Sequence, residues 1–176
     1  MRKQQKGFSL IELLIVVAII LIIAAIAIPN LMRAKMAANT SSAAAGERTI
    51  ITAEIGYYSA FPGIGYGTLL VLGGANGVQC TPNSATACLI DANLANNGPG
   101  GNGKSGYNYA ATPAVATATT PANFWTTATA LSKTSGTTAF CGSEDGVVRS
   151  SGSGADPTAV AAGSSAACQA LTPLQN

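Results

Sequence analysis

Residues 7–28 read GFSLIELLIVVAIILIIAAIAI. From residue 8 onward this run has 21 residues, of which only Ser9 and Glu12 are polar. A helix of this length crosses a hydrocarbon core of about 30 Å. The sequence therefore predicts one membrane-spanning helix near the N-terminus.

Charges on both sides of the run predict its orientation. Arg2, Lys3 and Lys6 precede it, whereas Arg33 and Lys35 follow it. Positive residues favour the cytoplasmic side, and the later pair weakens this bias without reversing it. We therefore expect the N-terminus in the cytoplasm and the rest of the chain across the membrane.

A cleavable secretory signal is an alternative interpretation of the same segment. The basic start, the apolar stretch and Ala25-Ile26-Ala27 fit its general pattern. The run is too long for an ordinary signal, however, and it contains an acid. A retained helix is the better prediction.

Glu12 is the most informative residue of the run. An acidic side chain inside a membrane segment costs about 2.5–3.5 kcal/mol on insertion scales, so we expect it to have a partner or a function. The simpler interpretation is a carboxyl group that snorkels to the cytoplasmic interface or stays protonated. The residues around Glu12 favour a function.

The sequence Gly7-Phe8-Ser9-Leu10-Ile11-Glu12-Leu13, after a short basic leader, resembles the prepilin signature of type IV pilins, in their short-leader, type IVa-like form. The resemblance implies that a membrane peptidase cuts after Gly7 and methylates the new N-terminus at Phe8. It further implies that Glu12 of one subunit neutralises the Phe8 amine of its neighbour in a filament. An unpaired ammonium group in an apolar bundle is heavily penalised, which gives the carboxylate a physical role.

Residues 31–58 are rich in alanine and other helix formers, so we expect the helix to continue from Phe8 to about Ser59. Its length would be about 78 Å. Pro29 predicts a kink, with the end of the helix as the alternative. Helical spacing predicts an apolar face in the last turns that packs on a sheet; its residues are Ile50, Ile51, Ala53, Ile55, Tyr57 and Tyr58.

From residue 61 the composition changes to Gly, Thr, Asn and Ser, which predicts a globular part. Residues 69–72 are a short helix or a strand, and residues 89–94 a helical turn. Strands are expected at residues 106–112, 124–131 and 138–150, the last folded into a hairpin at Glu144-Asp145-Gly146. The Thr- and Ala-rich tract 111–139 could instead be a disordered or glycosylated stalk. The tail from residue 150 should be mostly irregular.

The predicted fold class is α+β: a long N-terminal helix packed on a small antiparallel sheet of three or four strands. The pilin resemblance implies the same αβ-roll. We expect a leader at residues 1–7, a membrane and polymerisation helix at 8–30, an amphipathic second half at 31–60 and a disulfide-bonded head at 61–176.

Four cysteines in a translocated domain predict two disulfides, with three possible pairings. The resemblance favours Cys141 with Cys168, because many pilins carry a C-terminal disulfide loop. Cys80 with Cys88 rests on their proximity in the sequence. A zinc site of four cysteines is a weaker alternative, because no Cys-x-x-Cys spacing supports it.

Other chemistry has few candidates. The chain has no histidine, which excludes the usual nucleophile triads and imidazole metal sites. The acids after Glu54 are Asp91, Glu144, Asp145 and Asp156. We expect them to lie in solvated turns and not to form a catalytic carboxylate pair for hydrolysis. Calcium at Glu144, Asp145 and Asp156 is the metal alternative, because the resemblance extends to pseudopilins that bind calcium.

The net charge is +2, and the first seven residues contribute +3, so the remainder carries −1. Nucleic-acid binding is therefore not expected, nor is a cofactor. We interpret the chain as a non-enzymatic pilin precursor that lies in the inner membrane and then in a surface filament of identical subunits. Its further partners would be the prepilin peptidase and the assembly platform. A type II secretion pseudopilin is one alternative, and a membrane-anchored periplasmic enzyme or binding domain is another.

Overall fold

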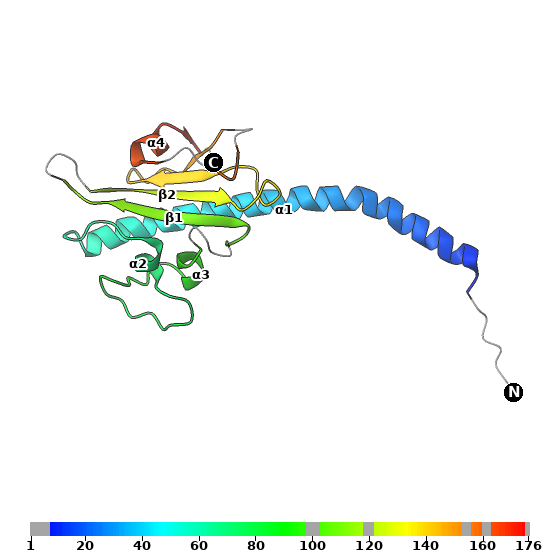
Figure 1. The fold of residues 1–176 in the computed structure, drawn as a ribbon, viewed down its shortest axis with the longest axis horizontal. Coiled ribbons are helices and arrows are strands. Elements are labelled where there is room, and N and C mark those ends of the chain that lie inside the picture. The colour runs from blue at the N-terminus through cyan, green and yellow to red at the C-terminus, as the bar shows by residue number, and fades with distance from the viewer. Residues whose placement is uncertain (1–7, 98–102, 118–121, 153–155, 160–162, 175–176) are drawn as a thin grey trace. The chain divides into compact units, whose positions relative to one another are not determined.

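The computed structural model describes residues 8–97, 103–117, 122–152, 156–159 and 163–174. Internal contacts divide the chain into two units, Met1–Lys35 and Met36–Asn176. Helix α1 (Leu10–Ala60) runs through both, and every other element belongs to the second unit (Figure 1). A long N-terminal helix with a small antiparallel sheet confirms the predicted α+β class.

The predicted long helix is present as α1, which has 51 residues. Pro29 lies inside it, so the alternative that the helix ends there is wrong. The kink at Pro29 stays a prediction. The helix stops at Ala60 because Pro62 disfavours the helical conformation at the residue before it.

The sheet has five strands in the order of the sequence, and each neighbouring pair is antiparallel. They are β1 (Tyr107–Ala114), β2 (Asn123–Ala130), β3 (Phe140–Ser143), β4 (Arg149–Ser150) and β5 (Thr172–Pro173). The predicted hairpin joins β3 to β4, and Gly146 in its turn has φ +76°, a conformation that favours glycine. The sequence predicted three or four strands. The sheet has a fifth, β5, because residues of the tail pair with β4.

The described part of the second unit also contains three short helices. The ambiguous residues 69–72 are helical in α2 (Leu69–Gly73), and α3 (Ala92–Ala95) supplies the expected turn. The tail is more regular than predicted, since it contains α4 (Ser165–Gln169) as well as β5. The Ser164 hydroxyl caps α4 by accepting a bond of 3.1 Å from the Ala167 N–H group.

The core of the second unit lies between α1 and the sheet. Ile50, Ile51, Ala53 and Tyr57 of α1 are buried in one cluster with aromatic residues of the strands. The predicted apolar face was wrong at Ile55 and Tyr58, which are 45% and 39% exposed. Two acids on the same helix, Glu47 and Glu54, are buried instead.

Candidate functional site

The N-terminal part of α1 presents an uncovered apolar surface. Every Leu, Ile, Val, Phe and Met side chain between Phe8 and Met32 is exposed. The helix is long and apolar enough to cross a membrane. An exposed apolar surface of this size marks a contact with lipid or with another protein.

Glu12 closes the first turn of this helix. The Ser9 N–H group donates a hydrogen bond of 3.2 Å to Glu12 Oε2, and the Leu13 N–H group donates one of 3.2 Å to the Ser9 carbonyl. Ser-x-x-Glu at the start of a helix is the capping-box pattern, in which the glutamate binds the backbone of the capping residue. The carboxylate is thereby held at the end of the helix where the macrodipole favours negative charge.

This cap directs the Glu12 side chain back toward the start of the helix. The capping residue, Ser9, directly follows Phe8 in the sequence. Phe8 is 85% exposed, so its surroundings are open. Gly7 lies outside the described residues. The sequence reasoning missed the cap, although Ser9-Leu10-Ile11-Glu12 carries its signal.

Glu47 is a buried carboxyl group in the segment 31–58, for which the sequence predicted only a helix. It is fully buried between α1 and the sheet. The Thr126 hydroxyl of β2 donates a hydrogen bond to its Oε1, and the backbone of Gly142 in β3 also bonds to it. Burial raises the pKa of Glu47 to about 8, against the opposing effect of these bonds.

Glu54 is the second buried acid of α1. Its Oε2 accepts a hydrogen bond of 2.9 Å from the Gly67 N–H group in the loop before α2. Burial raises its pKa to about 7, and the bond from Gly67 opposes the shift. The heptad spacing of Glu47 and Glu54 places both on one helical face, a signal that the sequence contained.

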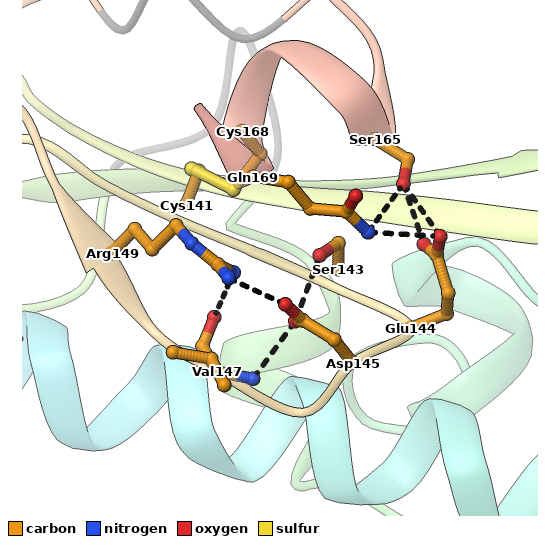
Figure 2. A network of polar contacts seen from close by, with 9 residues as sticks. All are labelled: Cys141, Ser143, Glu144, Asp145, Val147, Arg149, Ser165, Cys168 and Gln169. Atoms are coloured by element: carbon orange, nitrogen blue, oxygen red, sulfur yellow. Dashed lines mark hydrogen bonds and ion pairs between the residues drawn. A yellow bond between two sulfur atoms is a disulfide. The ribbon is translucent and has the colours of Figure 1, made fainter. Parts of the chain in front are cut away.

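The structure joins Cys141 to Cys168 and Cys80 to Cys88. Figure 2 shows the first bond holding α4 beside β3. Next to it, Glu144 accepts hydrogen bonds from Ser165 and Gln169 of α4 (Figure 2). Together with the pairing of β5 on β4, this disulfide and this polar cluster attach the tail to the β3–β4 hairpin.

Asp145 faces the other side of the hairpin turn. It forms an ion pair of 2.5 Å with Arg149 and accepts hydrogen bonds from Ser143 and Val147 (Figure 2). Partial burial alone would raise the pKa of Asp145, but Arg149, Val147 and Ser143 together hold it below its usual value. Arg149 is itself buried, whereas the Asp145 side chain is 31% exposed, so the pair is only partly shielded from solvent.

The acids considered for calcium are engaged separately. Glu144 binds α4, Asp145 binds Arg149, and Asp156 forms an ion pair of 3.2 Å with Lys133. Asp91 caps α3 and forms an ion pair of 3.1 Å with Lys104. Within the described ranges, the structure gathers no three acid, cysteine or histidine side chains as a metal site.

Comparison with known proteins places a family motif on the exposed helix. Residues 2–28 match the prokaryotic N-terminal methylation motif. The chain is 45% identical over 56 residues to the type IV major pilin protein PilA of Myxococcus xanthus, covering 32% of this chain and 26% of that protein. It is 62% identical over 37 residues to the type IV wide pilus major component PilA4 of Thermus thermophilus, covering 21% of this chain and 28% of that protein.

These similarities cover a limited part of each protein. The chain spans about a quarter of the length of the curated relatives it matches. No solved structure matches it. The chain therefore carries the prepilin methylation motif and resembles type IV major pilins over a part of its length.

Proposed function

We propose that this chain is the precursor of a type IV pilus subunit, a structural protein that polymerises through the N-terminal part of α1. In the proposed maturation, the leader 1–7 is removed after Gly7 and the new N-terminus at Phe8 is methylated. The globular residues 61–176 would then form the outer part of each subunit. The polymerisation helix would comprise residues 8–30. Its amphipathic continuation would comprise residues 31–60.

The observation that carries this proposal is the methylation motif on an uncovered apolar helix. The motif covers residues 2–28, and the large apolar side chains from Phe8 to Met32 are exposed. A plain membrane anchor would account for the apolar surface. It would not account for the methylation motif or for an acid five residues after the predicted cleavage position.

Glu12 supplies the proposed register between subunits. Cleavage before Phe8 creates an ammonium group, which costs several kcal/mol in an apolar bundle unless an anion pairs with it. The bond from Ser9 already directs the Glu12 carboxylate toward the start of its helix. We propose that the Glu12 carboxylate forms an ion pair with the Phe8 amine of a neighbouring subunit. Hydrophobic burial of the helices would hold the filament together.

The proposed partners follow from this route. The unassembled subunit lies in the inner membrane, where the prepilin peptidase and the assembly platform act on it. The finished filament lies at the cell surface. The role is structural, and the named relatives are pilus components.

Deletion and complementation test the proposal. Cells without this gene should lack the surface filaments that contain the protein, and the wild-type gene should restore them, as seen by shearing and electron microscopy. Filaments that persist in the deletion strain would overturn the assignment. Protein confined to the periplasm, with secretion lost in the deletion strain, would indicate a pseudopilin instead.

A further inference from the structure

Helix α1 buries two carboxyl groups that the proposed assembly does not use. Glu47 and Glu54 are each 0% exposed. They are separated by seven residues, about 10.5 Å along the helix, and attach it to different parts of the second unit. Glu47 bonds to β2 and β3, whereas Glu54 bonds to the loop before α2.

Both carboxyl groups have fewer partners than an ionised group needs. Glu47 Oε2 and Glu54 Oε1 have no hydrogen-bond partner among the described residues. An ionised carboxylate has about four acceptor sites, and burying it without partners for them is costly. A neutral carboxylic acid carries no net charge and needs fewer partners.

No cation compensates either group in the part of the chain that the structure describes. The three ion pairs there involve Asp91, Asp145 and Asp156. The titratable side chains that face the two acids are Tyr109 of β1, near Glu47, and Tyr66 of the loop, near Glu54. Burial raises the pKa of each tyrosine, so both are neutral around pH 7.

The surroundings of Glu47 include a further unpartnered group. Tyr109 Oη is buried and has no hydrogen-bond partner among the described residues. The field of Glu47 is one of the causes that raise the pKa of Tyr109. A negative charge at Glu47 would therefore meet no compensating cation on the β1 side of the core.

We propose that Glu47 and Glu54 form a proton-dependent lock between α1 and the rest of the second unit. As neutral acids they hold α1 against the sheet and against the loop at Gly67. Their ionisation places two uncompensated charges in this interface and loosens both attachments. The lock is closed in acid and opens from neutral to mildly alkaline pH.

The direction of the effect follows from proton linkage. In the unfolded chain a glutamate ionises near pH 4.5, whereas burial raises the pKa to about 8 for Glu47 and about 7 for Glu54. Above pH 4.5 the folded protein therefore binds more protons than the unfolded one, and its stability falls as the pH rises. The fall ends near pH 7 for Glu54 and near pH 8 for Glu47.

The first test follows thermal unfolding of the full chain in detergent micelles with its disulfides intact. Near-ultraviolet circular dichroism of the buried aromatic side chains reports on the head. The Tm of the wild-type protein should fall between pH 5 and pH 8 and level off by pH 9. The double variant Glu47→Gln/Glu54→Gln should lose most of this slope, because glutamine keeps the acceptor oxygen but does not ionise.

Glu144→Gln is the matched control, since it removes an exposed acid of the same type from the β3–β4 turn, where it bonds to Ser165 of α4. It should keep the wild-type slope. All variants share the same N-terminus, so titration of the α-amino group is common to them. A wild-type Tm that is constant from pH 5 to pH 9, or a double variant with the full slope, would overturn the proposal.

The second test needs no variant. Carbon-13 NMR of the glutamate side chains in the wild-type chain should show two carboxyl groups that titrate near pH 7 and pH 8, whereas an ordinary glutamate titrates near pH 4.5. Assignment of those signals to Glu54 and Glu47 would support the lock. Titration of both groups near pH 4.5 would refute it, even if the glutamine variants failed to fold.

Discussion

Ile51 on α1 fills the space beside Gly142 on β3 that a Cβ atom would otherwise occupy. A Cβ atom built on Gly142 would overlap Cδ1 of Ile51 and approach Thr126 Oγ1 to 2.9 Å. Both residues are buried in the second unit. The distance between helix and sheet at this point therefore depends on glycine.

Gly142→Ala should lower the free energy of unfolding of the head by about 1–3 kcal/mol, as expected for overpacking of a core. Urea unfolding of the full chain in detergent, followed by circular dichroism, measures the change. Gly152→Ala is the control, because no atom lies within 4 Å of a Cβ built there. Adding Ile51→Val to Gly142→Ala removes the clashing methyl group, so the two changes should cost less together than the sum of their separate effects. Additive costs would show that this contact is not the cause.

Glu12→Leu should separate membrane insertion from assembly. Removing the charge eases insertion, so the membrane pool of processed subunit should rise. The Phe8 amine would lose its proposed partner, so filaments in the sheared fraction should disappear. Wild-type filament yield from these cells would contradict the role given to Glu12.

Glu12→Gln tests whether the cap or the charge matters. The glutamine oxygen can still accept the bond from the Ser9 N–H group, but it carries no charge. If charge pairing dominates, this variant should also assemble far less well than the parent, measured by the same shearing assay. Normal assembly of the Gln variant would assign Glu12 to helix capping alone.

Replacing both Cys141 and Cys168 with serine should destabilise the head more than replacing Cys80 and Cys88. The cysteines are 27 residues apart in the first pair and 8 in the second. Chain entropy gives about 3.5 kcal/mol for the longer loop and about 2.5 kcal/mol for the shorter. Urea unfolding of the two double variants measures the difference. Cleavage of the leader should be unaffected in both, because the damage lies in the second unit, and equal stabilities would contradict the prediction.

The ion pair between Asp145 and Arg149 predicts a loss of stability in acid. The pKa of Asp145 lies below the usual 3.8, so the pair stabilises the fold above pH 3.8 and this contribution disappears as the pH falls through the lowered pKa. Asp145→Asn should therefore have a lower Tm than the wild type at pH 5. The difference in Tm between the two proteins should become smaller as the pH falls toward 2. A constant gap over this range would show that the ion pair does not contribute.

The sequence predicted α1 and most of the sheet because their signals are local. The apolar run, the alanine-rich continuation and the Asp145-Gly146 turn each specify their own backbone. β5 could not be predicted in the same way, because Thr172 and Pro173 are held by pairing with β4, a contact distant in the sequence.

The buried acids show a second limit of sequence reasoning. Glu47 and Glu54 look like ordinary surface residues of a helix, and only the packing of the sheet and of the loop before α2 against α1 shows that they are buried. The wrong prediction for Ile55 has the same cause. Periodicity predicted that one side of the helix is apolar, but it could not show which residues of that side are covered by the sheet. The Ser9–Glu12 cap, in contrast, was readable from its spacing.

Gly7→Val tests the cleavage of the leader after Gly7, on which the proposed filament assembly depends. A peptidase that approaches the backbone closely should need a small residue before the cut, so this variant should remain unprocessed. Immunoblotting of membranes should show the longer precursor, and no filaments should form. Filaments that begin at Phe8 in Gly7→Val cells would contradict the assigned cleavage site.

The intact mass of the subunit in sheared surface filaments is the sharpest test of the proposed cleavage, methylation and assembly. Our account predicts a chain that begins at Phe8, carries one additional methyl group on its N-terminal amine and retains two disulfides. Fragmentation of the N-terminal peptide would locate the methyl group. A subunit that begins at Met1, or one that is cut after Ala27 near the end of the apolar run, would contradict this maturation.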